Sequence, residues 1–242
     1  MKAASPRCRQ VQGLTLVELL VGLALMAIVL TAVQAVTTST MHANALLTAR
    51  AEMQSDAVIA NQLLLARARE ACAVAAQGSS VTLPNVPGTQ HGASRTWQVG
   101  TEPFVAFVTP DGAAERFYAY YLLSRADYEA QMPAQQSLAT VQGAEARVMM
   151  EFTVPLAPGT CNPAPGTVAV PPTSPAGTGA TALMVVNNVR VPTAAEPLFT
   201  VGADQAIVYT VRFERQVGAR RVVLPAENAD PYRYAIVGRN IR

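Results

Sequence analysis

The hydrophobic residues of this chain are concentrated in one long run near the N-terminus. Residues 14–36 are apolar except for Glu18 and a few small polar side chains. About twenty apolar residues in a helix span the hydrocarbon core of a bilayer. Because Lys2, Arg7 and Arg9 precede the run, the positive-inside rule predicts that the N-terminus faces the cytoplasm and that the rest is exported.

The apolar run continues into a segment with helical periodicity. From residue 46 onwards, apolar and mostly small residues recur at steps of three and four: Leu46, Ala49, Met53, Ala57, Ala60, Leu64, Ala68 and Ala71. No proline occurs between Pro6 and Pro84. We therefore expect one helix from about residue 14 to about residue 76, capped at Gly78. Its first half, 14–36, is a transmembrane or bundle-forming segment, and its second half, 37–77, is amphipathic and packs on a globular head.

The pattern changes to short alternating strands after Gly78. Strands are predicted at 95–99, 104–109, 116–123, 147–154, 182–186, 189–191, 206–215, 221–224 and 232–237. Turn residues at 110–112, 187–188 and 217–219 separate several of them and favour antiparallel pairing. Segment 126–136 is either a short helix or an irregular insert. Together these elements predict an α+β fold, with a long N-terminal helix on an antiparallel β-rich head at 78–242.

A segment rich in proline and glycine, 155–179, interrupts the head and is expected to be a surface loop. It contains Cys161, one of three cysteines. Cys8 lies in the basic leader, which leaves Cys72 and Cys161 as an even pair in an oxidising compartment. We expect a disulfide between them; unpaired thiols or an intermolecular link are the alternatives.

Composition gives no support for catalysis or for nucleic-acid binding. Without its first 13 residues the chain has 15 basic against 16 acidic residues, which is nearly neutral. The sequence lacks the common hydrolase, zinc-protease, redox and phosphate-binding motifs. We therefore expect no enzyme activity, no cofactor and no metal, and a nucleic-acid partner is not expected.

The residues around the acidic side chain carry a family resemblance. Gly13-Leu-Thr-Leu-Val-Glu18-Leu-Leu-Val-Gly22 resembles the class III signal of type IV pilins and type II secretion pseudopilins. The resemblance implies that prepilin peptidase removes leader 1–13 by cutting between Gly13 and Leu14, and then methylates the new amino terminus at Leu14. The family usually has phenylalanine where this chain has Leu14. The resemblance further implies that Glu18 neutralises an N-terminal amine in the filament. A carboxylate in a bilayer is costly, which agrees with such a role.

The long helix, the β-rich head and the chain length are similar to those of PilW-type minor pilins and J-type minor pseudopilins. This implies a pilin-like fold and a low-copy subunit that acts in assembly, in priming or at the tip of a type IV pilus. The implied partners are other pilins or pseudopilins, prepilin peptidase, the inner-membrane assembly platform and, before assembly, membrane lipid. The implied location is the inner membrane, with the head in the periplasm, and then the filament.

Three alternatives remain open on the sequence. The first is a minor pseudopilin of a type II secretion system, and the second is a tip pilin that acts as an adhesin or in DNA uptake. The third is a periplasmic binding domain or enzyme on an ordinary signal anchor. In the third case the chain would not be cut at Gly13, and an ordinary cleavage after Ala35 would be possible.

Overall fold

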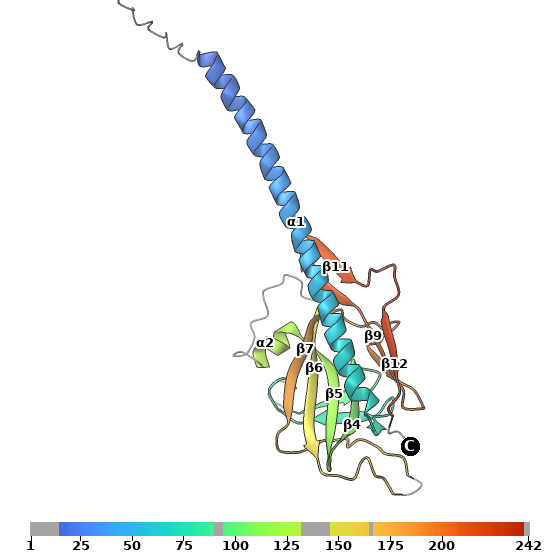
Figure 1. The fold of residues 1–242 in the computed structure, drawn as a ribbon. Coiled ribbons are helices and arrows are strands. Elements are labelled where there is room, and N and C mark those ends of the chain that lie inside the picture. Colours follow the sequence, from blue (N-terminus) through green and yellow to red (C-terminus); the bar gives the residue numbers. More distant parts are fainter. Residues whose placement is uncertain (1–14, 90–93, 132–145, 165–166, 240–242) are drawn as a thin grey trace, which may run out of the picture. The chain divides into compact units, whose positions relative to one another are not determined.

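The computed structural model describes residues 15–89, 94–131, 146–164 and 167–239. The chain divides into two units, Met1–Leu46 and Leu47–Arg242. Helix α1 (Leu16–Arg69) contributes to both of them (Figure 1). The secondary structure is α+β, as the sequence predicts.

In the first unit, α1 is apolar on all sides as far as Val36, and several of its threonines bond to their own helix. The hydroxyls of Thr31 and Thr37 donate to the carbonyls of Ile28 and Val33, both at 2.8 Å. A threonine bonded in this way leaves no donor unsatisfied in an apolar environment. The helix is long and apolar enough to cross a bilayer.

In the second unit, the amphipathic stripe lies as the periodicity predicts. Ala49, Met53, Ala60, Leu64 and Ala68 are all buried. These side chains form the buried face of the helix. Figure 1 shows this part of α1 crossing the face of the sheet that contains β4 (Phe104–Asp111), β5 (Ala114–Ser124) and β6 (Arg147–Leu156).

The predicted end of the helix at residue 76 or 77 is wrong, because α1 ends at Arg69. The next residues form the edge of the sheet instead. The backbone N–H of Cys72 donates to Val108 and that of Ala75 donates to Ala106, both at 2.9 Å. Strand β1 (Ala73–Val74) lies between these bonds and is buried. Pairing with β4 therefore overrides the helix propensity of an alanine-rich segment.

The predicted cap at Gly78 is wrong for the same reason. Gly78 has a φ of 80° and its backbone N–H donates to the carbonyl of Val99 at 2.9 Å, so it shapes a turn after β1. The helix end is satisfied elsewhere, because the N–H of Arg239 donates to the carbonyl of Arg69 at 2.8 Å.

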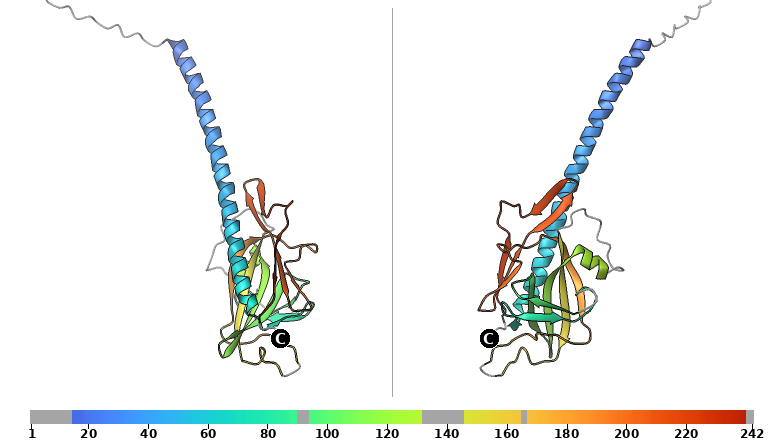
Figure 2. Two further views of the ribbon diagram at one scale, coloured as in Figure 1. Left: turned by 45° about the vertical axis from the view of Figure 1, so that its right-hand side comes forward. Right: turned by 180° about the vertical axis from the view of Figure 1, so that it is seen from behind.

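The core of the head is a seven-stranded antiparallel sheet with the order β1-β4-β5-β6-β7-β10-β11 (Figure 2). The remaining members are β7 (Thr181–Val189), β10 (Phe213–Val217) and β11 (Arg220–Leu224). The turns predicted at 110–112 and 217–219 are confirmed as the tight connections of β4 to β5 and of β10 to β11. Short links of this kind enforce antiparallel neighbours.

Large aromatic side chains fill the centre of this sheet. Phe107 stacks on Tyr118 and on Tyr120, with ring centroids 5.8 and 6.0 Å apart. The hydroxyl of Tyr120 donates to the carboxylate of buried Glu151, and that of Tyr121 donates to the carbonyl of Gly88 at 2.6 Å. The tyrosines of β5 are therefore core residues.

The strand predicted at 206–215 is two strands in different sheets. β9 (Ile207–Val211) lies in a three-stranded sheet with β8 (Phe199–Val201) and β12 (Tyr232–Ile236), whereas β10 belongs to the main sheet. Arg212 separates them and is 8% exposed. A further two-stranded sheet pairs β2 (Ser80–Leu83) with β3 (Arg95–Gln98).

The turn predicted at Asn187-Asn188 is also wrong, because both residues lie inside β7. The pairing of β6 with β7 shifts register there, and Asn188 has a φ of 62°. Asparagine tolerates this left-handed conformation, so the pair forms a β-bulge, not a turn. Of the undecided segment 126–136, the part up to residue 131 is helical in α2 (Arg125–Gln131), and the rest lies outside the described residues.

Candidate functional site

The start of α1 forms a compact hydrogen-bonded cap. The hydroxyl oxygen of Thr15 accepts the backbone N–H of Glu18 at 3.3 Å, and the same hydroxyl faces the Glu18 carboxylate at 3.5 Å. The carbonyl of Thr15 accepts the N–H of Leu19 at 3.2 Å. Threonine before a helix and glutamate three residues later have the spacing of a capping box. The cap places the Glu18 carboxylate on the first turn, where the helix dipole favours negative charge.

Thr15 is a site residue that the sequence reasoning missed, although the spacing Thr-x-x-Glu was visible in it. Gly13 and Leu14, the residues of the expected cleavage and methylation, lie outside the described residues. Of the three residues expected to act in processing and assembly, the structure describes only Glu18.

The surface around Glu18 is apolar and uncovered within its own unit. Leu16, Val17 and Leu20 are 76, 67 and 56% exposed. Comparable exposure of large apolar side chains continues along the helix to Val36. A continuous apolar surface of this size requires a bilayer or other helices as its environment.

The family model for the prokaryotic N-terminal methylation motif matches residues 8–33, which include the glycine, the acid and the first turns of α1. The chain carries the signal that marks type IV pilins and pseudopilins. Curated proteins and solved structures gave no match. For this pilin-like chain, the signal implies processing by prepilin peptidase and assembly with other pilins, and the apolar helix fits a membrane-anchored pilin.

The head of this pilin-like chain carries a disulfide directly after α1. Cys72 bonds to Cys161 with their Cα atoms 5.2 Å apart, and the bond closes a sequence separation of 89 residues. It joins the edge of the sheet at β1 to the proline- and glycine-rich loop. The loop expected at 155–179 begins slightly later in the structure, because β6 extends to Leu156.

A buried carboxylate fixes the same loop next to the disulfide. Glu115 is 3% exposed and accepts the backbone N–H groups of Gly159, Thr160 and Cys161 at 2.8, 2.9 and 2.8 Å. Burial acts to raise the pKa of Glu115, but these donors outweigh it and leave the pKa below its ordinary value of 4.5. No sequence signal identified Glu115, because its partners lie more than forty residues away.

We expect Glu115→Gln to lower the free energy of unfolding by about 2 kcal/mol at neutral pH, because an amide replaces a buried ion that accepts three backbone N–H groups. Since the folded pKa is lowered, the contribution of Glu115 is fully present above about pH 4.5 and is lost as pH falls through the folded pKa. Denaturant unfolding of both proteins between pH 7 and pH 3 should therefore show a difference that shrinks in acid.

The control is Asp111→Asn, which removes the carboxylate of a half-exposed ion pair with Arg116. Such a pair is worth less than about 1 kcal/mol, so this variant should stay close to the wild type. A difference between wild type and Glu115→Gln that does not change with pH would contradict the role of the Glu115 charge.

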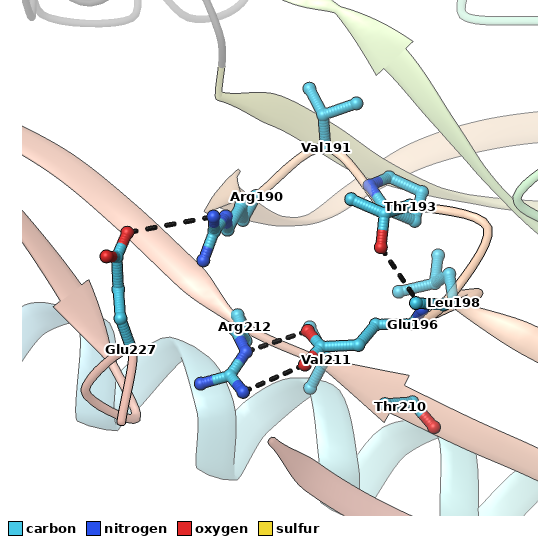
Figure 3. A pocket seen from close by; sticks show the side chains of 11 residues that line it. Arg190, Val191, Thr193, Glu196, Leu198, Thr210, Val211, Arg212 and Glu227 are labelled. Atoms are coloured by element: carbon cyan, nitrogen blue, oxygen red, sulfur yellow. Dashed lines mark hydrogen bonds and ion pairs between the residues drawn. The ribbon is translucent and has the colours of Figure 1, made fainter. Parts of the chain in front are cut away.

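A second polar feature of the head is a cavity of about 320 Å³ beside β9 and β10 (Figure 3). Its best-bonded residue is Arg212, whose Nε and Nη2 donate to the Glu196 carboxylate at 2.8 and 2.9 Å. Arg212 lies within the strand predicted at 206–215, and its burial was not predicted. The hydrogen bond from Arg212 holds the pKa of Glu196 below its usual range.

The described residues hold no group of three or more His, Cys, Asp or Glu side chains suited to a metal ion. His42 is exposed on α1, and His91 lies outside the described residues. The candidate functional site is therefore the start of α1, where a capped first turn holds Glu18 next to an exposed apolar helix surface.

Proposed function

We propose that the chain is a minor, low-copy subunit of a type IV pilus that acts in pilus assembly, in priming or at the tip. The observation that carries this proposal is the methylation signal at residues 8–33, joined to an exposed apolar helix whose first turn holds Glu18. The proposed role is mechanical, and we assign no catalytic step to the head.

The proposed assembly chemistry depends on an amine that processing creates. A cut after Gly13 gives Leu14 a positive terminal amine, four positions before Glu18 in the sequence. Opposite charges attract strongly where the dielectric constant is low, whereas either charge alone is penalised there. The carboxylate of Glu18 would therefore pair with an amine, its own or that of a neighbouring subunit, when α1 leaves the lipid for a helical bundle.

The size and composition of the head support a low-copy place in the filament. The head carries a seven-stranded sheet, two smaller sheets and a disulfide-pinned loop, whereas the major pilins that the signal resembles are usually smaller. The proposed location is the inner membrane with the head in the periplasm, followed by the filament. The proposed partners are other pilins, prepilin peptidase and the assembly platform. A minor pseudopilin of a type II secretion system would share all these features.

We expect the mature chain to begin at Leu14 with a methylated amine. Intact-mass and peptide mass spectrometry of the membrane-purified protein measures this directly. An intact leader, or a cut after Ala35, would contradict the proposal and favour an ordinary signal anchor. Quantifying the chain in sheared pili, and separately in the pseudopilus fraction, distinguishes the two filament systems.

A further inference from the structure

The part of α1 that packs on the head has an exposed side that carries no charge. Between residues 53 and 67 the buried side of the helix is formed by Ala60 and Leu64. The exposed residues of the same segment lie together on the opposite side, because most of them recur at steps of three and four. This set, the outer face of α1, consists of Gln54, Ser55, Val58, Ile59, Gln62 and Ala66. All of it belongs to the second unit of the chain.

Two large β-branched residues stand at the centre of the outer face. Val58 and Ile59 are 53 and 48% exposed, although a helix packed on one side usually presents charged residues on the other. Leu47, which is 63% exposed, and Ala51 continue the same side by steps of four towards the N-terminus of α1. In Figure 1 this part of the helix lies in front of the sheet, and no labelled strand passes in front of it. The head therefore leaves these apolar side chains uncovered.

The acidic residues of the same segment contact the head instead of the outer face. Glu52 forms an ion pair with Arg215 of β10. The carboxylate of Asp56 accepts a hydrogen bond from the side chain of Asn188 in β7. Both acids therefore help to fix α1 on the sheet, and the outer face is left to an uncharged partner.

The surroundings of the outer face favour a protein helix over lipid as that partner. Arg50 is exposed and the side chain of Glu52 is 50% exposed, so a bilayer that covered this side would bury charges at a high cost. Gln54 and Gln62 lie one turn on either side of Val58, and an apolar centre with a polar rim is typical of protein interfaces. The row from Leu47 to Val58 is about 16 Å long at 1.5 Å per residue, and such a row fits the side of another helix.

We propose that the outer face of α1 receives the apolar part of α1, residues 16–36, from a neighbouring subunit that carries the same signal. This inference rests on the proposed function, since it assigns a contact within the filament. The signal supplies the kind of partner, because it implies assembly with other pilins. The apolar part supplies the matching surface, because its large side chains are more than half exposed and need protein contacts once they leave the lipid. Packing between subunits would thus extend into the part of α1 that carries the head.

Photo-crosslinking of the full chain in cells tests the identity of the partner. The photoreactive residue benzoylphenylalanine replaces Val58 in one variant and Val168 in the control, which is 61% exposed in the proline- and glycine-rich loop. We expect the probe at position 58 to join peptides from the apolar N-terminal run of another chain that carries the signal, and the probe at position 168 to miss them. Mass spectrometry of the joined peptides identifies the segment reached.

Each other crosslinking result overturns the inference. Adducts of position 58 with lipid alone would assign the outer face to the membrane surface, and adducts with peptides from the head of another subunit would assign it to a contact between heads. The same peptides from positions 58 and 168 would show that the contact is not specific to the helix. Absence of any adduct at position 58 would show that the outer face stays in solvent.

Sheared filaments separate a failure of this contact from a failure of the proposed function. We expect the double variant Val58→Ser/Ile59→Ser to be recovered there at least about fivefold less than the control Val168→Ser/Val170→Ser, because it loses apolar area buried between subunits. The control removes two side chains that are 61 and 66% exposed in the loop. Equal recovery of the two variants would overturn the helix contact alone. Absence of the wild-type chain from filaments would overturn the proposed function itself.

Discussion

Glu18→Gln should reduce the amount of this chain in sheared filaments at least about tenfold, while membrane insertion and removal of the leader remain unchanged. The amide keeps the shape of the side chain and can still be accommodated at the capped first turn of α1. It lacks the charge that would pair with the terminal amine, so the amine enters the low-dielectric helical bundle unpaired. Immunoblots of filament and membrane fractions, normalised to each other, measure the effect.

The matched control is Thr31→Ala in the same helix. The hydroxyl of Thr31 bonds to the carbonyl of Ile28 in its own helix, so it needs no partner from another chain. Its removal should leave incorporation near the wild-type level. Normal incorporation of Glu18→Gln would reject the pairing role of the acid, whatever the control does.

Removal of the disulfide should have the largest effect on the stability of the head. In the loop-entropy model, closing a separation of 89 residues stabilises the fold by about 4–5 kcal/mol. The double variant Cys72→Ser/Cys161→Ser should lose roughly this free energy of unfolding, as measured by denaturant titration. The loss is large because the bond restricts the unfolded chain over a long closed loop.

Two comparisons separate the effect of losing the disulfide from the effect of the substituted side chains. Wild-type protein unfolded with a reductant present should match the double variant, and Cys8→Ser should match oxidised wild type, because Cys8 precedes the expected cleavage point. A double variant as stable as the oxidised wild type would show that the bond contributes nothing to the fold.

Local periodicity was enough to predict much of this architecture. The stripe of Ala49, Met53 and Leu64 follows from spacing alone, and β5 and β6 follow from their apolar, aromatic composition. The tight turns at 110–112 and 217–219 follow from glycine at positions that have a positive φ. In each case the residues that determine the structure are neighbours in the sequence.

The errors occurred where distant residues decide the outcome. The alanine-rich segment after Arg69 is locally helical, yet its N–H groups find partners on β4. Arg212 lies in a segment whose alternation predicts one continuous strand, but it separates two sheets and is held by Glu196 and the loop after β11. For the candidate site, the signal in the sequence indicated the position of Glu18, whereas the cavity at Arg212 depends on segments that only the fold brings together.

The junction between α1 and the sheet determines how the head withstands tension. A pull on α1 that overcomes the packing of its buried stripe reaches β1 next, because β1 follows the helix by a few residues and pairs with β4. The disulfide at Cys72 diverts part of the same force to Cys161 and so to a second point of the head. A reduced molecule under traction would therefore be expected to detach at this short edge strand first, while the oxidised molecule shares the strain across the sheet.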